Sequence, residues 1–213
     1  MFPTVFSYIA LAVVSTQLLT GSAQSAQVLG VENMSLQDRY PVESVNTVFK
    51  DNILLSLAYL RGSQSHDKSV DWASVEKPFT YAFTLQPGEV FAFHQDVLPE
   101  FAGKVVKTMD STFGGTDGYK SDGYLFGDGV CHMATILNWA ASDAGLRVVA
   151  PTPHDFANIP DIPKKYGTAI YFNPGTPGSN ALQNLYIQNT KEKPVTFVLS
   201  YEKENLHVEV TQK

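Results

Sequence analysis

The chain has 213 residues, of which 44% are hydrophobic, 12% aromatic and 17% charged. This composition excludes a disordered tail, a collagen-like fibre and a coiled coil, and the length predicts one compact domain. Lys and Arg total 15 against 21 Asp and Glu, which gives a formal net charge of −6, and the sequence contains no basic cluster. Such a surface repels phosphate backbones, so nucleic acid is excluded as a partner.

Residues 1–23 predict a signal peptide. Residues 5–19 form an uncharged apolar run, and Gly21 and Ala23 are small residues typical of a signal-peptidase site. The run is shorter than the ~20 residues that span a bilayer as a helix. Because no Lys or Arg precedes it, an uncleaved short anchor is the alternative, and it would be the protein's only contact with the membrane. Either case predicts an exported protein, secreted or held in the cell envelope.

The rest of the chain predicts an α+β fold in a single domain over 41–213, after a flexible lead-in over 24–40. Helices come mostly first and strands mostly last, so we expect two main helices packed on antiparallel strands. Strands 79–85 and 90–93 form either a hairpin or two strands joined by a tight corner. In chain order, the spacing of apolar residues predicts a helix from 41 to about 61, strands at 79–85 and 90–93, a Gly-rich loop at 111–130, a helix at 131–144, and strands at 168–172, 182–188, 195–201 and 206–210, the last forming a meander.

The sequence contains one cysteine, Cys131, at the start of the second helix. At ~100° per residue, Cys131 lies opposite the apolar stripe of this helix and in line with Thr135, Asn138 and Ser142. The N–H groups and dipole of a helix N-terminus stabilise a thiolate, whereas Asp128, the expected N-cap, opposes it. The thiol is therefore a candidate nucleophile, and a structural cysteine is the alternative.

A nucleophilic thiol needs a base, and His154 follows the helix at a distance that lets the chain fold back. In this hypothesis Cys131 attacks and His154 acts as base and then acid, with His132 as the other candidate base. The backbone N–H groups of Gly129, Val130 and His132 would hold an oxyanion. The group that orients His154 is left open among Asp155, Asn158, Asp161 and Asn173.

Four further side chains are candidates for the walls of a cleft. Thr135 and Asn138 leave room beside the thiol, Tyr124 lies in the Gly-rich loop, and His94 ends a predicted strand and could rim the same cleft. The cysteine and histidines match no known zinc spacing, so we expect neither a metal nor a cofactor.

The chain resembles the VanW-like family, which is named for an accessory protein of B-type vancomycin-resistance clusters. The resemblance covers roughly 79–201. Its most specific part is a Gly-x-Gly-Val-Cys block, followed by His154 at the spacing that the family shows. It is carried by Phe91-Ala92-Phe93-His94, Gly127-Asp128-Gly129-Val130-Cys131-His132, Ala134-Thr135, Asn138, Ala144-Gly145-Leu146 and His154. Members are typically bacterial and envelope-associated, so the resemblance implies a location more firmly than a reaction.

The sequence also departs from the family pattern. The family usually has Asn at position 94, Gly at 128 and Gln at 132. It usually has Ser after the histidine that corresponds to His154, where Asp155 stands here. A later Gly-x-Asp-Ala-Thr is common in the family, but residues 166–169 lack that Asp. Cys131 and His154 therefore match the family pattern, whereas the carboxylate that would orient His154 has no counterpart, and Asp155 is the candidate substitute.

Two functions follow from these observations. The first is a thiol-dependent amidase, peptidase or transpeptidase that acts on amide or peptide bonds of cell-wall material. The second is a non-catalytic envelope module that binds peptidoglycan or a partner protein, with Cys131 and His154 as structural residues.

Overall fold

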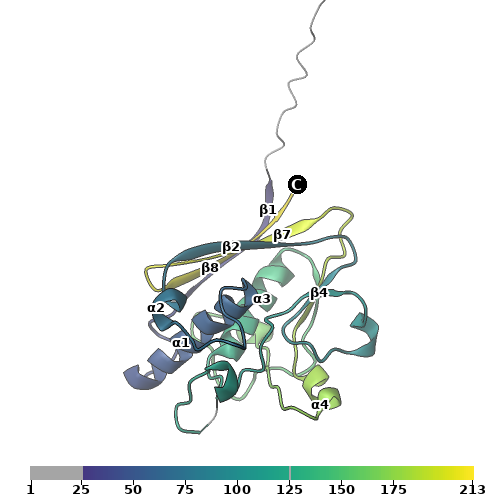
Figure 1. Ribbon diagram of the computed structural model, residues 1–213. Helices are drawn as coiled ribbons and strands as arrows, with labels where there is room; N and C mark the ends of the chain where they lie inside the picture. The colour runs from purple at the N-terminus through teal and green to yellow at the C-terminus, as the bar shows by residue number, and fades with distance from the viewer. Residues whose placement is uncertain (1–25, 125) are drawn as a thin grey trace, which may run out of the picture.

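The computed structural model describes residues 26–124 and 126–213 (Figure 1). The predicted signal peptide at 1–23 lies outside the described residues. Within the described part of the chain, no helix combines the length and the apolar character needed to cross a membrane.

The larger sheet consists of four antiparallel strands in the order β1-β8-β7-β2. Every second side chain of β7, from Val195 to Tyr201, is buried, as expected for a strand with one face on the core. Lys203 and Glu204 join β7 to β8, and both have positive φ, which is typical of the tight turns that suit twisted hairpins. The strands are β1 (Gln27–Ser35), β2 (Phe79–Leu85), β7 (Val195–Glu202) and β8 (Asn205–Gln212).

Two helices cover the inner face of this sheet (Figure 1). α3 (Val130–Asp143) packs directly under β1 and β8, and α1 (Glu43–Leu60) packs against α3. Most of α3 is buried because apolar side chains face both the sheet and α1. The short helix α2 (Trp72–Val75) follows α1 and leads into β2.

The smaller sheet is mixed and has the order β4-β3-β6-β5. β3 pairs with β4 in parallel, and the other two pairs are antiparallel. Its strands are β3 (Val90–Ala92), β4 (Val105–Lys107), β5 (Arg147–Val149) and β6 (Tyr186–Gln188), with α4 (Pro177–Leu182) before β6 and single 3₁₀ turns at Pro99–Phe101, Gly115–Asp117 and Lys164–Tyr166.

The α+β single domain is confirmed, as are both long helices and the strands at 79–85 and 195–201. β2 and β3 belong to different sheets, so the chain turns a corner between them rather than forming a hairpin. β7 and β8 form a hairpin, but β6 lies in the other sheet, so the predicted meander is only partly present.

The flexible lead-in at 24–40 is a wrong prediction for most of its length. Residues 27–35 form β1, which pairs with β8, and Met34 and Leu36 are buried in the core. Gly30 explains how β1 approaches α3 so closely, because a Cβ there would lie 2.6 Å from the carbonyl oxygen of Ala140. The segment has no regular apolar pattern, and its order comes from pairing with the far end of the chain.

The predicted strand at 168–172 is also wrong. Ala169 and Tyr171 donate backbone hydrogen bonds to Thr152 and Gln183, but the segment forms only one isolated bridge, between Pro153 and Thr168. The backbone of Thr168 and Ile170 instead binds side chains of α3. Strand β6 likewise begins later than predicted, because residues 177–182 form α4.

Candidate functional site

The Gly-rich loop ends where α3 meets α1. Gly129 is the N-cap of α3, with φ of 98°, and a Cβ there would lie 2.5 Å from the carbonyl oxygen of Phe49. Asp128, the expected cap, makes no capping bond; its carbonyl instead accepts from the Asn52 side chain at 2.9 Å. Burial raises the pKa of the Asp128 carboxyl, and Asp122 adds to the effect. The close packing of α3 against α1 therefore explains why a glycine occupies position 129.

The polar face of α3 holds the backbone of residues 166–170. An α-helix rises about 6 Å over four residues, close to the rise of an extended chain over two, so side chains one turn apart can serve alternate residues of the segment. The contacts are the Thr168 N–H to Thr135 Oγ1 at 3.0 Å, Asn138 Nδ2 to the Tyr166 carbonyl at 2.9 Å, and the Ile170 N–H to Cys131 Sγ at 3.4 Å.

Cys131 is the last member of this set. Its thiol also donates to the Ile170 carbonyl at 3.7 Å, and its side chain packs against the core. Burial raises the pKa of the Cys131 thiol to about 11, and the Asp128 carboxylate adds to the rise. The sequence sets the helix N-terminus, which lowers the thiol pKa, against Asp128, which raises it; in the structure burial decides the direction, and the thiol is neutral at pH 7. Among the described residues, Cys131 makes no hydrogen bond to His154.

His154 lies at the base of a loop that folds back on α3. Its N–H donates to the Gly167 carbonyl at 3.1 Å, and its ring packs on exposed Phe156 with centroids 4.0 Å apart. The side chain is buried, and burial lowers the pKa of the ring. Asp155 is exposed, and within the described chain it forms no hydrogen bond with the His154 ring, so the expected orienting role has no geometric support.

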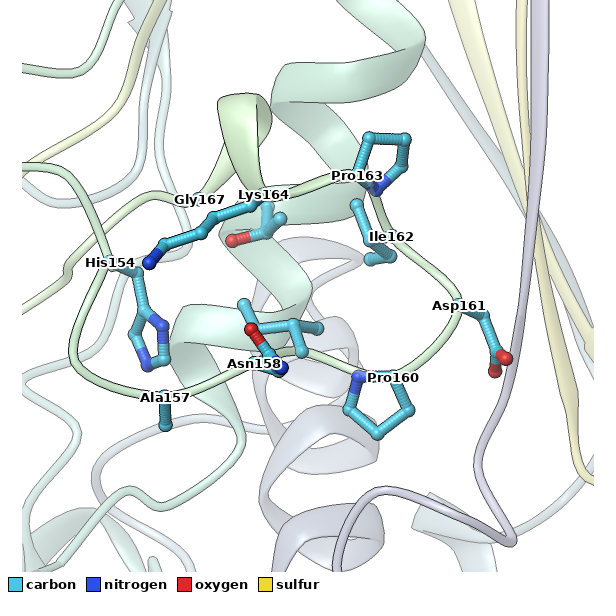
Figure 2. A pocket seen from close by; sticks show the side chains of 11 residues that line it. His154, Ala157, Asn158, Pro160, Asp161, Ile162, Pro163, Lys164 and Gly167 are labelled. Carbon is cyan, nitrogen blue, oxygen red and sulfur yellow. The ribbon is translucent and has the colours of Figure 1, made fainter.

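The loop covers a cavity of about 330 Å³ (Figure 2). Thr135, His154 and Gly167 form part of its wall, and the rest comes from residues 157–164. Figure 2 shows the Lys164 side chain extending toward His154, whereas Asp161 points away from the cavity. Cys131 does not line this cavity. The structure thus separates the two residues that the sequence paired: His154 faces the cavity, and Cys131 lies in the scaffold.

His132 is not an alternative base for the thiol. It is buried, and its ring packs edge-on against Phe49, with centroids 5.0 Å apart. Burial lowers the pKa of His132 to about 3, and the charge of Arg39 and the His154 ring lower it further.

Two other predicted cleft residues lie elsewhere. His94 is fully buried: its N–H donates to Asn184 at 3.2 Å, and its ring nitrogen Nε2 lies 3.2 Å from the Gln183 carbonyl oxygen. Tyr124 is 91% exposed on the Gly-rich loop. Val130 is buried in the first turn of α3. Neither His94 nor Tyr124 lines the cavity, so the predicted set does not converge on one cleft.

Arg39 is a site residue that sequence reasoning missed. It is buried, and it donates from Nη1 to the Pro160 carbonyl at 3.0 Å and from Nη2 to Asp161 at 2.7 Å. Both acceptors belong to the loop that covers the cavity. No local signal marks Arg39, because its partners lie more than 120 positions away.

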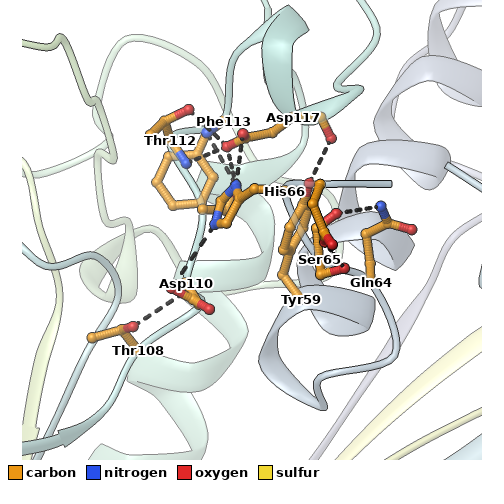
Figure 3. Close-up of polar contacts among 11 residues, drawn as sticks. Tyr59, Gln64, Ser65, His66, Thr108, Asp110, Thr112, Phe113 and Asp117 are labelled. Atoms are coloured by element: carbon orange, nitrogen blue, oxygen red, sulfur yellow. Dashed lines mark hydrogen bonds and ion pairs between the residues drawn. The ribbon is translucent and has the colours of Figure 1, made fainter. Parts of the chain in front are cut away.

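His66 belongs to a second polar cluster (Figure 3). The His66 Nδ1 lies 3.0 Å from Asp117, and the His66 Nε2 lies 3.9 Å from exposed Asp110. Asp117 also accepts a hydrogen bond from the Thr112 N–H at 2.6 Å. The hydrogen bond to Asp117 raises the pKa of His66. In the part of the chain that the structure describes, no three His, Cys, Asp or Glu side chains converge to hold a metal ion.

Fold and cavity together define an α+β domain with a small polar pocket beneath a loop. A family model described as VanW like protein matches residues 80–211, which is more than half of the chain. The chain therefore belongs to the VanW-like family, and this membership indicates a protein associated with the cell envelope. No curated protein and no solved structure matches the sequence.

Proposed function

We propose that this protein is an exported, non-catalytic module of the cell envelope that binds cell-wall material through the pocket beneath residues 154–167. The observation that carries the proposal is the bonding of Cys131: its sulfur exchanges both of its hydrogen bonds with the backbone of Ile170. A thiol used in this way, with its pKa raised, supplies little thiolate for attack. Cys131 acts as a structural residue, as the second hypothesis from the sequence holds.

The pocket supplies what a binding module needs. It is concave, it is formed by residues of two separate segments, and its wall combines polar groups with the apolar residues Ile159 and Ile162. The segment 166–170, fixed to α3 by three side chains, provides a rigid base for the loop. Peptidoglycan is the proposed ligand because it is the main polymer of the compartment to which the family points.

Sedimentation with purified peptidoglycan sacculi tests this proposal. We expect the wild type, Cys131→Ser and Ala73→Trp to sediment alike, because none of these changes touches the pocket. Ala157→Trp places a large side chain in the pocket wall and should lose most of the bound fraction. Ala73, exposed on α2, is its matched control. Release of soluble fragments by the wild type but not by Cys131→Ser, or equal binding by the two Trp variants, would contradict the proposal.

A further inference from the structure

Three buried polar atoms without partners lie beneath the same loop. Among the described residues, Nε of Arg39 and Nδ1 of both His132 and His154 are buried and have no hydrogen-bond partner. The three residues are 2%, 5% and 6% exposed, and the two imidazole rings lie 6.2 Å apart in an edge-on arrangement. Buried polar groups are nearly always paired, because an unpaired one keeps the full cost of its desolvation. Three such groups together indicate a site whose partner is a ligand.

The tip of the loop now holds the position in front of Arg39. The Arg39 guanidinium donates from Nη2 to the Asp161 carboxylate and from Nη1 to the Pro160 carbonyl, and its Nε has no partner. A guanidinium fits a carboxylate best through two parallel N–H bonds, so this arrangement uses it incompletely.

The loop tip is also strained and partly exposed. Asp161 has φ of 66°, a left-handed conformation that costs a non-glycine residue free energy, and its side chain is 59% exposed. A second cavity, of about 380 Å³, lies on the other side of Pro160, so the tip has space on both sides. Ile159 and Ile162 on either side of the tip are buried in the core, so movement is confined to Pro160 and Asp161.

We propose that the loop tip at Pro160 and Asp161 forms a lid that its own Asp161 carboxylate holds closed, and that a ligand carboxylate replaces Asp161 on Arg39. The ring N–H groups of His132 and His154 then donate to the ligand, and Lys164 in the pocket wall adds a positive charge beside it (Figure 2). The ligand class is a molecule with a free carboxylate, such as a peptide C-terminus. This inference rests on the proposed function, since His154 and Lys164 line the proposed pocket. Arg39 and His132 do not line it while the tip is closed, and Arg39 becomes accessible from it only when Asp161 moves.

Calorimetric titration with two synthetic peptides tests the inference. The probes are N-acetyl-trialanine with a free C-terminal carboxylate and the same peptide as its C-terminal amide. We expect the acid to bind about tenfold more tightly than the amide, the ratio typical of a charge-assisted hydrogen bond. Asp161→Asn removes the competing charge and should tighten binding of the acid about fivefold, whereas Arg39→Lys should abolish it.

The controls separate a binding effect from a folding effect. Glu192→Gln removes one exposed carboxylate away from the lid and should bind like the wild type. Asp161 is exposed, so Asp161→Asn remains a valid test even if Arg39→Lys fails to fold. Equal affinity for acid and amide, no change in Asp161→Asn relative to Glu192→Gln, or no binding by any variant would overturn the inference. If the wild type still sediments with sacculi in any of those cases, only the inference about the carboxylate is overturned. If the wild type does not sediment with sacculi, the proposed function is overturned.

Discussion

Replacing Thr135 by Val tests the role of the polar face of α3. The two side chains have nearly the same volume, but Val cannot accept the hydrogen bond that the Thr168 N–H makes to Thr135 Oγ1 at 3.0 Å. Thr135 and Thr168 are 1% and 0% exposed, so bulk water has little access to the position of the lost acceptor. A buried donor left without a partner costs about 1–3 kcal/mol, and we expect a loss of about 2 kcal/mol in the free energy of unfolding.

Urea denaturation followed by circular dichroism measures this loss. The matched control is Thr80→Val on β2, where the side chain is exposed and the same substitution should change stability by less than about 0.5 kcal/mol. The m-value should stay constant in both variants, because neither changes the surface exposed on unfolding. If Thr135→Val is no less stable than Thr80→Val, the polar face does not hold the 166–170 segment in the way described.

Three other changes have expected outcomes. Gly129→Ala should lower the urea midpoint, with a loss of about 2 kcal/mol or more, because the Cβ meets the Phe49 carbonyl and φ is positive; an unchanged midpoint would contradict this packing. The hydrogen bond with Asp117 raises the pKa of His66, and hydrogen bonds lower that of Asp117 despite burial. The stability from this pair should therefore be lost as pH rises through the folded-state pKa of His66 and as pH falls through that of Asp117; His66→Asn should flatten the pH profile of the urea midpoint. Asn184→Ala removes a fully buried amide with five hydrogen bonds and should cost more than about 3 kcal/mol by thermal unfolding, and a smaller loss would count against that network.

Much of the fold follows from local patterns in the sequence. The apolar spacing of residues 41–61 and 131–144 predicts both long helices, and the alternation of residues 79–85 predicts β2. β1 escapes this reasoning because its pattern is weak and its pairing partner, β8, lies at the other end of the chain.

The candidate site shows where sequence reasoning stops. The helical wheel correctly places Cys131, Thr135 and Asn138 on one polar face, but it cannot tell whether substrate, water or backbone occupies that face. Here backbone occupies it, since the segment 166–170 binds all three side chains. Arg39 lies beyond such reasoning for a different reason: its contacts with Pro160 and Asp161 exist only in the folded chain.

Alkylation of Cys131 by iodoacetamide across pH tests most directly whether this sulfur is structural. In the folded protein we predict an apparent thiol pKa near 11, and therefore a labelling rate at pH 7.4 roughly two orders of magnitude below that of a free thiol with pKa ~8.5. In urea the rate should return to the free value. An apparent pKa below ~8.5 in the folded protein, raised again in His154→Ala, would instead show an activated nucleophile and contradict the assignment.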